Sequence, residues 1–372
     1  MIYLDYAANT PVDPEVLNCF CETAAQYPGN PNSAHPAGTA ARRELERITD
    51  GIAELLSAAP EEVIFTSGAA ESNNLAVKGI AEAYRNNGRH IITTPLEHPS
   101  TADSLAYLQE QGWEVDTLHL TADGSIDLKE LSALLRPDTV LLTISLADSE
   151  LGIIQPLSAI QSLLTVYPAC HLHVDATQAL GWVPVTFAGM DTMSFAPHKF
   201  GGLAGTGILM KRRGLRLTPQ IHGGGMQTLR SGTPSLALAA STETALRKAL
   251  AEEPSRTARV RALNHRLRSA LAVYPRAEIN SPADAVPDIL NLSVTGISGP
   301  SFQRMLAERG FCVSVRSACE TAGAPSAAVL AVSGDRRRAL SSWRISLGAD
   351  TTEEEIDHFL ACFAQILKGL PV

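Results

Sequence analysis

Between residues 62 and 210 the sequence alternates between short apolar runs and segments with helical patterns. Strands that alternate with helices are joined by right-handed crossovers into a mostly parallel sheet, and the helices cover both of its faces. The alternation therefore predicts an α/β fold built on a mostly parallel, seven-stranded sheet. The predicted strands are residues 62–66, 90–94, 114–118, 139–146, 172–175, 192–195 and 207–210.

The sequence changes character after residue 235, where a long helix rich in alanine, leucine and arginine is predicted. Its later part is typical of a smaller α+β domain, and a capping-box pattern at Thr352 starts a terminal helix. We therefore expect a large domain over residues 16–240, a small C-terminal domain over residues 241–372, and an N-terminal segment (1–15) associated with the small domain. The elements predicted after residue 235 are helices 235–273, 300–308 and 352–370 and strands 288–294, 311–315 and 343–347.

Chemically suitable groups follow several of the predicted strands, namely Ser67-Gly68, His98, Asp175 and Lys199. Ligands of such sheets bind beyond the carboxyl ends of the strands, so we expect these groups to lie close together. A lysine can carry an aldehyde cofactor as a Schiff base, and a carboxylate can keep a pyridine nitrogen protonated. Pyridoxal 5'-phosphate (PLP) needs both groups. Spacing alone is equally compatible with Lys199 as an ordinary loop lysine.

The composition narrows the possible partners and surroundings. The net charge of −9 argues against nucleic acid as the main partner, because a phosphate-binding face needs a surplus of basic residues. No apolar run is long enough for a membrane span, and we expect no secretory leader. The six cysteines form no CxxC pair, so neither a zinc site nor a disulfide framework is expected. A reducing cytoplasm is the expected location.

The motifs together resemble the class V, fold-type I PLP enzymes, and within them the NifS/IscS-type cysteine desulfurases. The resemblance extends over nearly the whole chain, and the order and spacing of the motifs are highly specific. It implies a fold-type I transferase that acts as a homodimer. The matching segments are residues 3–11, 29–31 with 33–35, 65–69 with 71–76, 97–98, 173–178, 198–199, 222–225, 230–233, 317–319 and 344–348.

The resemblance assigns cofactor roles to particular residues. Lys199 corresponds to the lysine that binds the cofactor and later moves protons, and Asp175 to the acid that pairs with the pyridinium nitrogen. His98 corresponds to the histidine that stacks on the ring and assists proton transfer; a buried structural histidine is the alternative. The other cofactor residues implied by the resemblance are Gln178 near the ring hydroxyl, His198 and the Gly68-Ala69-Ala70 turn at the phosphate, Ser149 at the ring, and Thr233, which reaches the phosphate of the neighbouring subunit.

The resemblance also implies the substrate, L-cysteine, and the route of its sulfur. Arg344 corresponds to the arginine that binds the substrate carboxylate, and Ser149 and Asn9 complete the expected substrate site. Cys319 corresponds to the cysteine that attacks the substrate sulfur and becomes a persulfide, for transfer to a protein acceptor that the sequence does not identify. An inert surface thiol is the alternative for Cys319.

Several residues depart from the pattern of the family. Ala70 and Ala196 stand where hydroxyl residues usually contact the phosphate, and Ser149 stands where the family has asparagine. The loss of these polar contacts leaves two alternatives open. One is a dimeric paralogue that binds or regulates and has little or no chemistry; the other is a related C–S or C–Se lyase of the selenocysteine-lyase type. An active cysteine desulfurase, with roles in sulfur transfer and iron–sulfur cluster assembly, is the favoured hypothesis.

Overall fold

The computed structural model describes residues 1–225, 228–315 and 324–370. Its centre is a seven-stranded sheet in the order β2-β8-β7-β6-β5-β3-β4, in which only β8 runs against its neighbours. The predicted mostly parallel, seven-stranded sheet is therefore confirmed. The strands are β2 (Val63–Thr66), β3 (His90–Thr93), β4 (Glu114–Thr117), β5 (Thr139–Ser145), β6 (His171–Asp175), β7 (Thr192–Phe195) and β8 (Gly207–Lys211).

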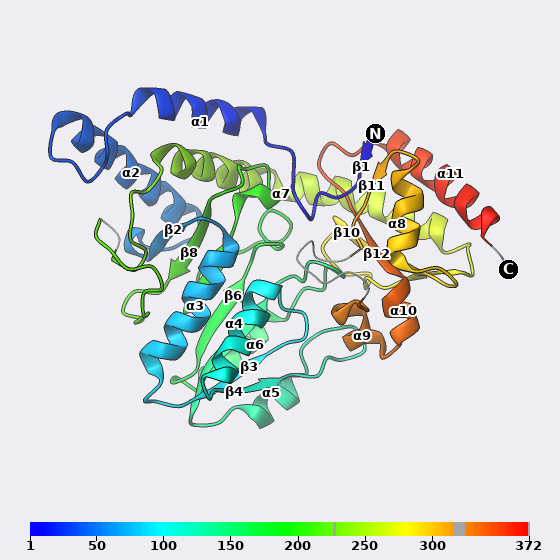
Figure 1. The fold of residues 1–372 in the computed structure, drawn as a ribbon, viewed down its shortest axis with the longest axis horizontal. Coiled ribbons are helices and arrows are strands. Elements are labelled where there is room, and N and C mark those ends of the chain that lie inside the picture. Colours follow the sequence, from blue (N-terminus) through cyan, green and yellow to red (C-terminus); the bar gives the residue numbers. More distant parts are fainter. Residues whose placement is uncertain (226–227, 316–323, 371–372) are drawn as a thin grey trace.

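Helices cover both faces of this sheet (Figure 1). Successive residues of a strand point to opposite sides, and both sides of these strands carry apolar residues that the helices bury. On β3, Ile91 packs with helices α3 and α4, whereas its neighbour Ile92 belongs to the core on the other side. Leu141 and Leu142 of β5 divide in the same way. The helices are α3 (Ala69–Tyr84) and α4 (Pro99–Glu110) on the first face, and α2 (Pro36–Leu55), α5 (Leu128–Leu134) and α6 (Leu157–Leu164) on the second.

Helix α7 (Leu236–Leu271) is 36 residues long and extends from the sheet towards the C-terminal part of the chain (Figure 1). Ser235 caps its N-terminus by accepting a hydrogen bond from the backbone N–H of Leu238. Helices α1 (Pro14–Gln26) and α2 pack against it. The predicted helix 235–273 agrees with these bounds to within two residues at each end.

The C-terminal part contains a small antiparallel sheet in the order β12-β10-β9, together with the parallel pair β1 and β11. The predicted strand over residues 311–315 is too long, because its partner β1 has only two residues to pair with it. Strand β9 was not predicted. The elements of this part are β1 (Ile2–Tyr3), β9 (Ala277–Ile279), β10 (Ile289–Val294), β11 (Phe311–Cys312), β12 (Ser342–Ser346), α8 (Gly299–Ala307), α9 (Ala327–Ser333), α10 (Arg336–Ser341) and α11 (Glu353–Gly369).

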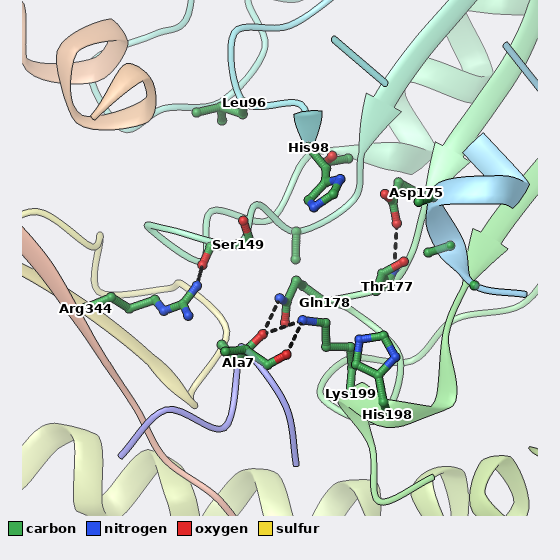
Figure 2. Close-up of a pocket in the computed structure, with 16 residues that line it drawn as sticks. Ala7, Leu96, His98, Ser149, Asp175, Thr177, Gln178, His198, Lys199 and Arg344 are labelled. Atoms are coloured by element: carbon green, nitrogen blue, oxygen red, sulfur yellow. Dashed lines mark hydrogen bonds between the residues drawn. The ribbon is translucent and has the colours of Figure 1, made fainter. Parts of the chain in front are cut away.

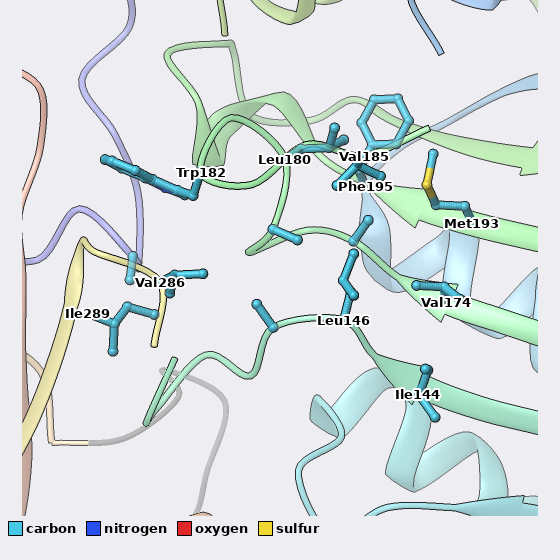
Figure 3. Close-up of a cluster of buried hydrophobic side chains, with 14 of the residues drawn as sticks. Ile144, Leu146, Val174, Leu180, Trp182, Val185, Met193, Phe195, Val286 and Ile289 are labelled. Carbon is cyan, nitrogen blue, oxygen red and sulfur yellow. The ribbon is translucent and has the colours of Figure 1, made fainter. Parts of the chain in front are cut away.

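The hydrophobic core is continuous between the two parts of the chain. Ile144 and Val174 of the large sheet belong to the same buried cluster as Ile289, the first residue of β10, and Val286, which lies just before that strand (Figure 3). Trp182 is in this cluster as well. Shared apolar packing of this kind holds the large sheet and the C-terminal part in a defined arrangement.

Candidate active site

A cavity of about 300 Å³ lies beyond the carboxyl ends of the parallel strands. Its lining brings together His98, Asp175, Lys199 and Arg344, although these residues come from four separate segments of the chain (Figure 2). Lys199 and Asp175 thus share one cavity, as the sequence analysis expected. This is the position at which open α/β sheets bind their ligands.

Lys199 ends a short 3₁₀ turn, Pro197–Lys199, that follows strand β7. Its Nζ donates hydrogen bonds to the backbone carbonyls of Ala7, at 2.7 Å, and Ala8, at 2.8 Å. The side-chain amide of Gln178 donates to the same carbonyl of Ala7, at 2.9 Å (Figure 2). The N-terminal segment therefore orients the lysine and Gln178 at one wall of the cavity.

Asp175 is the last residue of β6 and is 6% exposed. Its Oδ1 accepts a hydrogen bond from the backbone N–H of Thr177 at 2.9 Å, and its Oδ2 accepts from the side-chain amide of Asn73 at 2.8 Å. Two donors hold the carboxylate in a single orientation at the cavity. An ionised acid held in this way can pair with a protonated ring nitrogen.

His98 is the N-cap of helix α4, and its ring lines the cavity. The Nδ1 atom accepts a hydrogen bond from the backbone N–H of Ser100 at 3.1 Å and lies 2.8 Å from the Ser100 hydroxyl. The capping role therefore holds the ring by one nitrogen. The ring lies across the cavity from Lys199 and Gln178 (Figure 2).

The start of helix α3 forms another wall of the cavity, through Gly68, Ala69 and Ala70. The N-cap residue Gly68 makes no side-chain cap, so nothing on that residue competes for the first backbone N–H groups of the helix. Unpaired N–H groups at a helix N-terminus attract anions. This wall can therefore hold a phosphate with backbone groups alone.

His198 also lines the cavity, and its Nδ1 is a buried polar atom with no hydrogen-bond partner among the described residues. Burial, aided by the charge of Lys199, lowers the pKa of His198 to about 4. The ring is therefore neutral near pH 7. An unsatisfied ring nitrogen beside the lysine suits a polar ligand atom at this point.

These observations together test whether the cavity suits PLP, and the residues fit. A lysine, an oriented carboxylate, a histidine ring and a helix N-terminus surround one cavity. PLP needs these four groups, for its aldehyde, its pyridine nitrogen, its aromatic ring and its phosphate, in that order. Ala70 adds no hydroxyl to the phosphate wall. Ala196 is fully buried.

Arg344 lies on β12 of the small sheet and is 2% exposed. Its Nη2 pairs with Asp5 Oδ1 at 3.0 Å, its Nη1 donates to the backbone carbonyl of Ser149, and its Nε has no partner among the described residues. Asp5 also accepts a hydrogen bond from the Ser314 hydroxyl, at 2.8 Å. The guanidinium is thereby held at the cavity, where a planar, charged fork can bind a carboxylate.

Three residues expected at the site are not part of this lining. Asn9 is exposed, and its side-chain amide donates to the carbonyl of Thr10. Thr233 lines a different cavity, together with Ser67, and accepts a hydrogen bond from Asn30. Cys319 lies outside the described residues.

The sequence analysis missed some contributors to the site. Ala7 and Ala8 act through their backbone carbonyls, and the residue type does not indicate such a role, because every residue has a carbonyl. Thr177 also acts through its backbone N–H. Asn73 belongs to a matching motif, so its position was noted, but its hydrogen bond to Asp175 was not foreseen.

Comparison with known proteins adds independent evidence. The family model described as aminotransferase class-V matches residues 2–359. A NifS/IcsS protein homolog of Lactobacillus delbrueckii subsp. bulgaricus is 39% identical over 99% of this chain and 97% of its own length. The cysteine desulfurase IscS of Klebsiella pneumoniae subsp. pneumoniae is 40% identical over 96% of this chain and 90% of its own length. A solved structure of a NifS-like protein superimposes with a TM-score of 0.93 at 34% identity, covering 99% of this chain and 100% of that one.

Within the described ranges, no helix combines the length and the apolar character that a membrane crossing requires. Over the same residues, no group of three or more histidine, cysteine and acidic side chains is arranged to hold a metal ion.

Proposed function

Since the chain belongs to the class-V aminotransferase family, we propose that it is a PLP-dependent cysteine desulfurase. It converts L-cysteine to L-alanine and passes the sulfur to a protein acceptor. The observation that carries this proposal is the convergence of Lys199, Asp175 and Arg344 on one cavity, in a chain about two-fifths identical to a named cysteine desulfurase.

When bound, PLP supplies an electron sink that weakens the bonds at the substrate's α-carbon. Lys199 is the attachment point and moves a proton, and the carbonyls of Ala7 and Ala8 orient its Nζ. Asp175 would pair with the ring nitrogen and favour its protonated form, and His98 would contact the cofactor from the opposite side of the cavity to Lys199. The amides at the start of α3 bind the phosphate.

Arg344 orients the substrate by its α-carboxylate. Because the guanidinium is already held by Asp5 and by the Ser149 carbonyl, little side-chain freedom is lost when the carboxylate binds. Ser149 itself lines the cavity, and its side chain is shorter than the asparagine expected at this position. Arg344 therefore supplies most of the recognition of the carboxylate.

Cys319 receives the sulfur. In the balanced reaction, the carbon–sulfur bond of the substrate breaks and leaves its electron pair on the carbon, which takes up a proton. The departing sulfur bonds to the Cys319 sulfur, which has lost its own proton, and forms a persulfide. A thiolate is the attacking form. We further propose a cytoplasmic homodimer in which Thr233, which lies beside Ser67 in a separate cavity, serves the phosphate site of the neighbouring subunit.

The test is the absorbance spectrum of the purified protein, together with assays for alanine and sulfide after L-cysteine and a reductant are added. A yellow protein that forms alanine and sulfide in equal amounts supports the proposal. A protein that stays colourless and inert in excess PLP favours the non-catalytic alternative. A yellow protein that ignores cysteine but cleaves selenocysteine favours the lyase alternative.

Two variants separate the parts of the mechanism. Lys199→Ala should abolish the yellow colour. Cys319→Ser should keep the colour and stop sulfur transfer, whereas Cys312→Ser, a change of the same kind in strand β11, should leave transfer unchanged. Release of sulfide at the wild-type rate by Cys319→Ser would contradict the persulfide route.

A further inference from the structure

Asn73 lies in helix α3 and is completely buried beneath the cavity. Its Nδ2 donates to Asp175 Oδ2 at 2.8 Å and to the Ser100 hydroxyl at 2.9 Å. Its Oδ1 lies 3.1 Å from Nε2 of His173 and also accepts from the Ser194 hydroxyl. Protein groups therefore take both donor and both acceptor positions of this amide.

The direction of these hydrogen bonds follows from Asp175. A carboxylate can only accept, so the NH₂ end of Asn73 must face it and the carbonyl end must face His173. Burial lowers the pKa of His173 to about 4, so this ring is neutral near pH 7. It then donates from Nε2 to Asn73, while its Nδ1, 2.9 Å from the Thr192 hydroxyl, accepts.

The same orientation determines what Ser100 does. Its hydroxyl accepts from Asn73 Nδ2, so its own proton is directed at His98 Nδ1, 2.8 Å away. The backbone N–H of Ser100 donates to the same nitrogen. With two donors at Nδ1, the proton of a neutral His98 ring resides on Nε2.

We propose that Asn73 is a positioning residue that links the two cofactor contacts, Asp175 and His98: through Ser100, it holds His98 in the Nε2–H form while it orients the Asp175 carboxylate. One buried amide thereby sets the orientation of two residues that would hold the cofactor, the Asp175 carboxylate and, through Ser100, the His98 ring. A hydroxyl can donate or accept, and without Asn73 the Ser100 hydroxyl is free to accept a proton from Nδ1. This inference deepens the proposed function and depends on it for the identity of the cofactor.

The experiment follows the His98 tautomer by NMR in cofactor-free protein that carries isotope-labelled histidine, with His98→Gln to assign the signals. Wild type should show the Nε2–H form. Asn73→Ala and Ser100→Ala should each raise the ratio of the Nδ1–H form to the Nε2–H form about five- to tenfold, the effect of one hydrogen bond. In the Ser100→Ala background, Asn73→Ala should add nothing, because its route to His98 is already broken.

Ser104→Ala is the matched control, since Ser104 is buried one turn further along α4 and, among the described residues, its hydroxyl donates to the Ser100 carbonyl alone. It should leave the tautomer unchanged. A wild-type tautomer ratio in Ser100→Ala overturns the proposal, even if Asn73→Ala fails to fold. Additive effects in the double variant overturn the coupling.

A second measurement distinguishes a failure of this proposal from a failure of the proposed function. The dissociation constant for PLP, measured on the same variants, should rise more in Asn73→Ala than in Ser100→Ala, because only Asn73 also contacts Asp175. Equal affinities in the two variants contradict the link to Asp175. A wild-type protein that binds no PLP but has the expected tautomer contradicts the proposed function alone.

Discussion

Asp5 and Arg344 are 339 positions apart in the sequence, yet Asp5 Oδ1 and Arg344 Nη2 form an ion pair of 3.0 Å at the edge of the active-site cavity. Asp5 forms an isolated bridge with Ser346 of β12, so this pair ties the N-terminal segment to the small sheet. The N-terminal segment thus holds three site residues, Lys199 and Gln178 through backbone carbonyls and Arg344 through a carboxylate. Its conformation and the arrangement of the cavity are therefore interdependent.

Asp5→Asn should lower the free energy of unfolding, since it leaves the buried Arg344 guanidinium without its anion. We expect a loss of about 1–3 kcal/mol in urea unfolding, with a higher KM for cysteine because the fork is less well oriented. Asp357→Asn is the control, because it removes an acid from an exposed pair with Arg266 and should cost less than about 1 kcal/mol. Equal losses in the two variants would contradict the structural role of Asp5.

The buried His173 predicts a loss of stability in acid. Burial lowers its pKa from 6.5 to about 4 in the folded protein, so below pH 6.5 the unfolded chain takes up a proton that the folded chain does not. The stability that His173 contributes is complete above pH 6.5 and is lost as the pH falls towards about 4. His173→Gln should therefore flatten the dependence of the unfolding free energy on pH in this window. His198 titrates in the same direction, so part of the slope should remain.

His265→Gln, on the exposed surface of α7, provides the comparison, because it makes the same substitution at a histidine that is not buried. The measurement is urea unfolding at several pH values. The slope of the unfolding free energy against pH is compared between the variants, so a difference in their overall stability does not affect the result. If His173→Gln keeps the full wild-type slope, the pKa of His173 is not depressed in the folded state.

The buried Glu97 predicts the opposite trend, a loss of stability as the pH rises from 4.5 to about 8. Burial raises its pKa from 4.5 to about 8, because three hydrogen bonds from Thr94 and Ser145 do not compensate for the lost hydration. Above pH 4.5 the unfolded chain releases a proton that the folded chain keeps, so stability falls as the pH rises to about 8. Glu97→Gln, which remains neutral, should lose less stability than wild type across this range. A slope unchanged from wild type would mean that Glu97 ionises normally when folded.

Much of the large sheet could be predicted, because the periodicity of its strands reflects burial on both faces. Strand β6 illustrates this, since all five of its residues are buried, its leucine and valine alternate with histidines, and it ends at Asp175, which faces the cavity. The position of a polar residue at the end of such a strand places it at the carboxyl edge of the sheet. The meeting of Asp175 and Lys199 follows from that rule, together with the parallel order of β6 and β7.

The remainder depended on contacts that have no local pattern. The bonds of Lys199 to Ala7 and Ala8 use backbone carbonyls, which every residue carries, so the types of side chain could not reveal them. Strand β11 was predicted too long because an apolar run shows where a strand can form but not the length of its partner. The hydrogen bonds of Asn73 join residues of α3, α4 and β6, so they can be recognised only when the relative positions of these elements are known.

The alanine at position 70 makes the phosphate wall testable by gain of affinity. Ala70 lines the cavity in the first turn of α3, where a threonine hydroxyl could donate to a phosphate oxygen beside the helix amides. Since a hydrogen bond to a charged group contributes about 1.5–3 kcal/mol, Ala70→Thr should lower the dissociation constant for PLP by about tenfold or more. Ala70→Val, which has the shape of threonine without its hydroxyl, is the control. Both cofactor-free variants are titrated with PLP and followed by absorbance. The difference between them gives the effect of the hydroxyl apart from the effect of the larger side chain. If threonine and valine change the affinity equally, the phosphate does not bind at the start of α3.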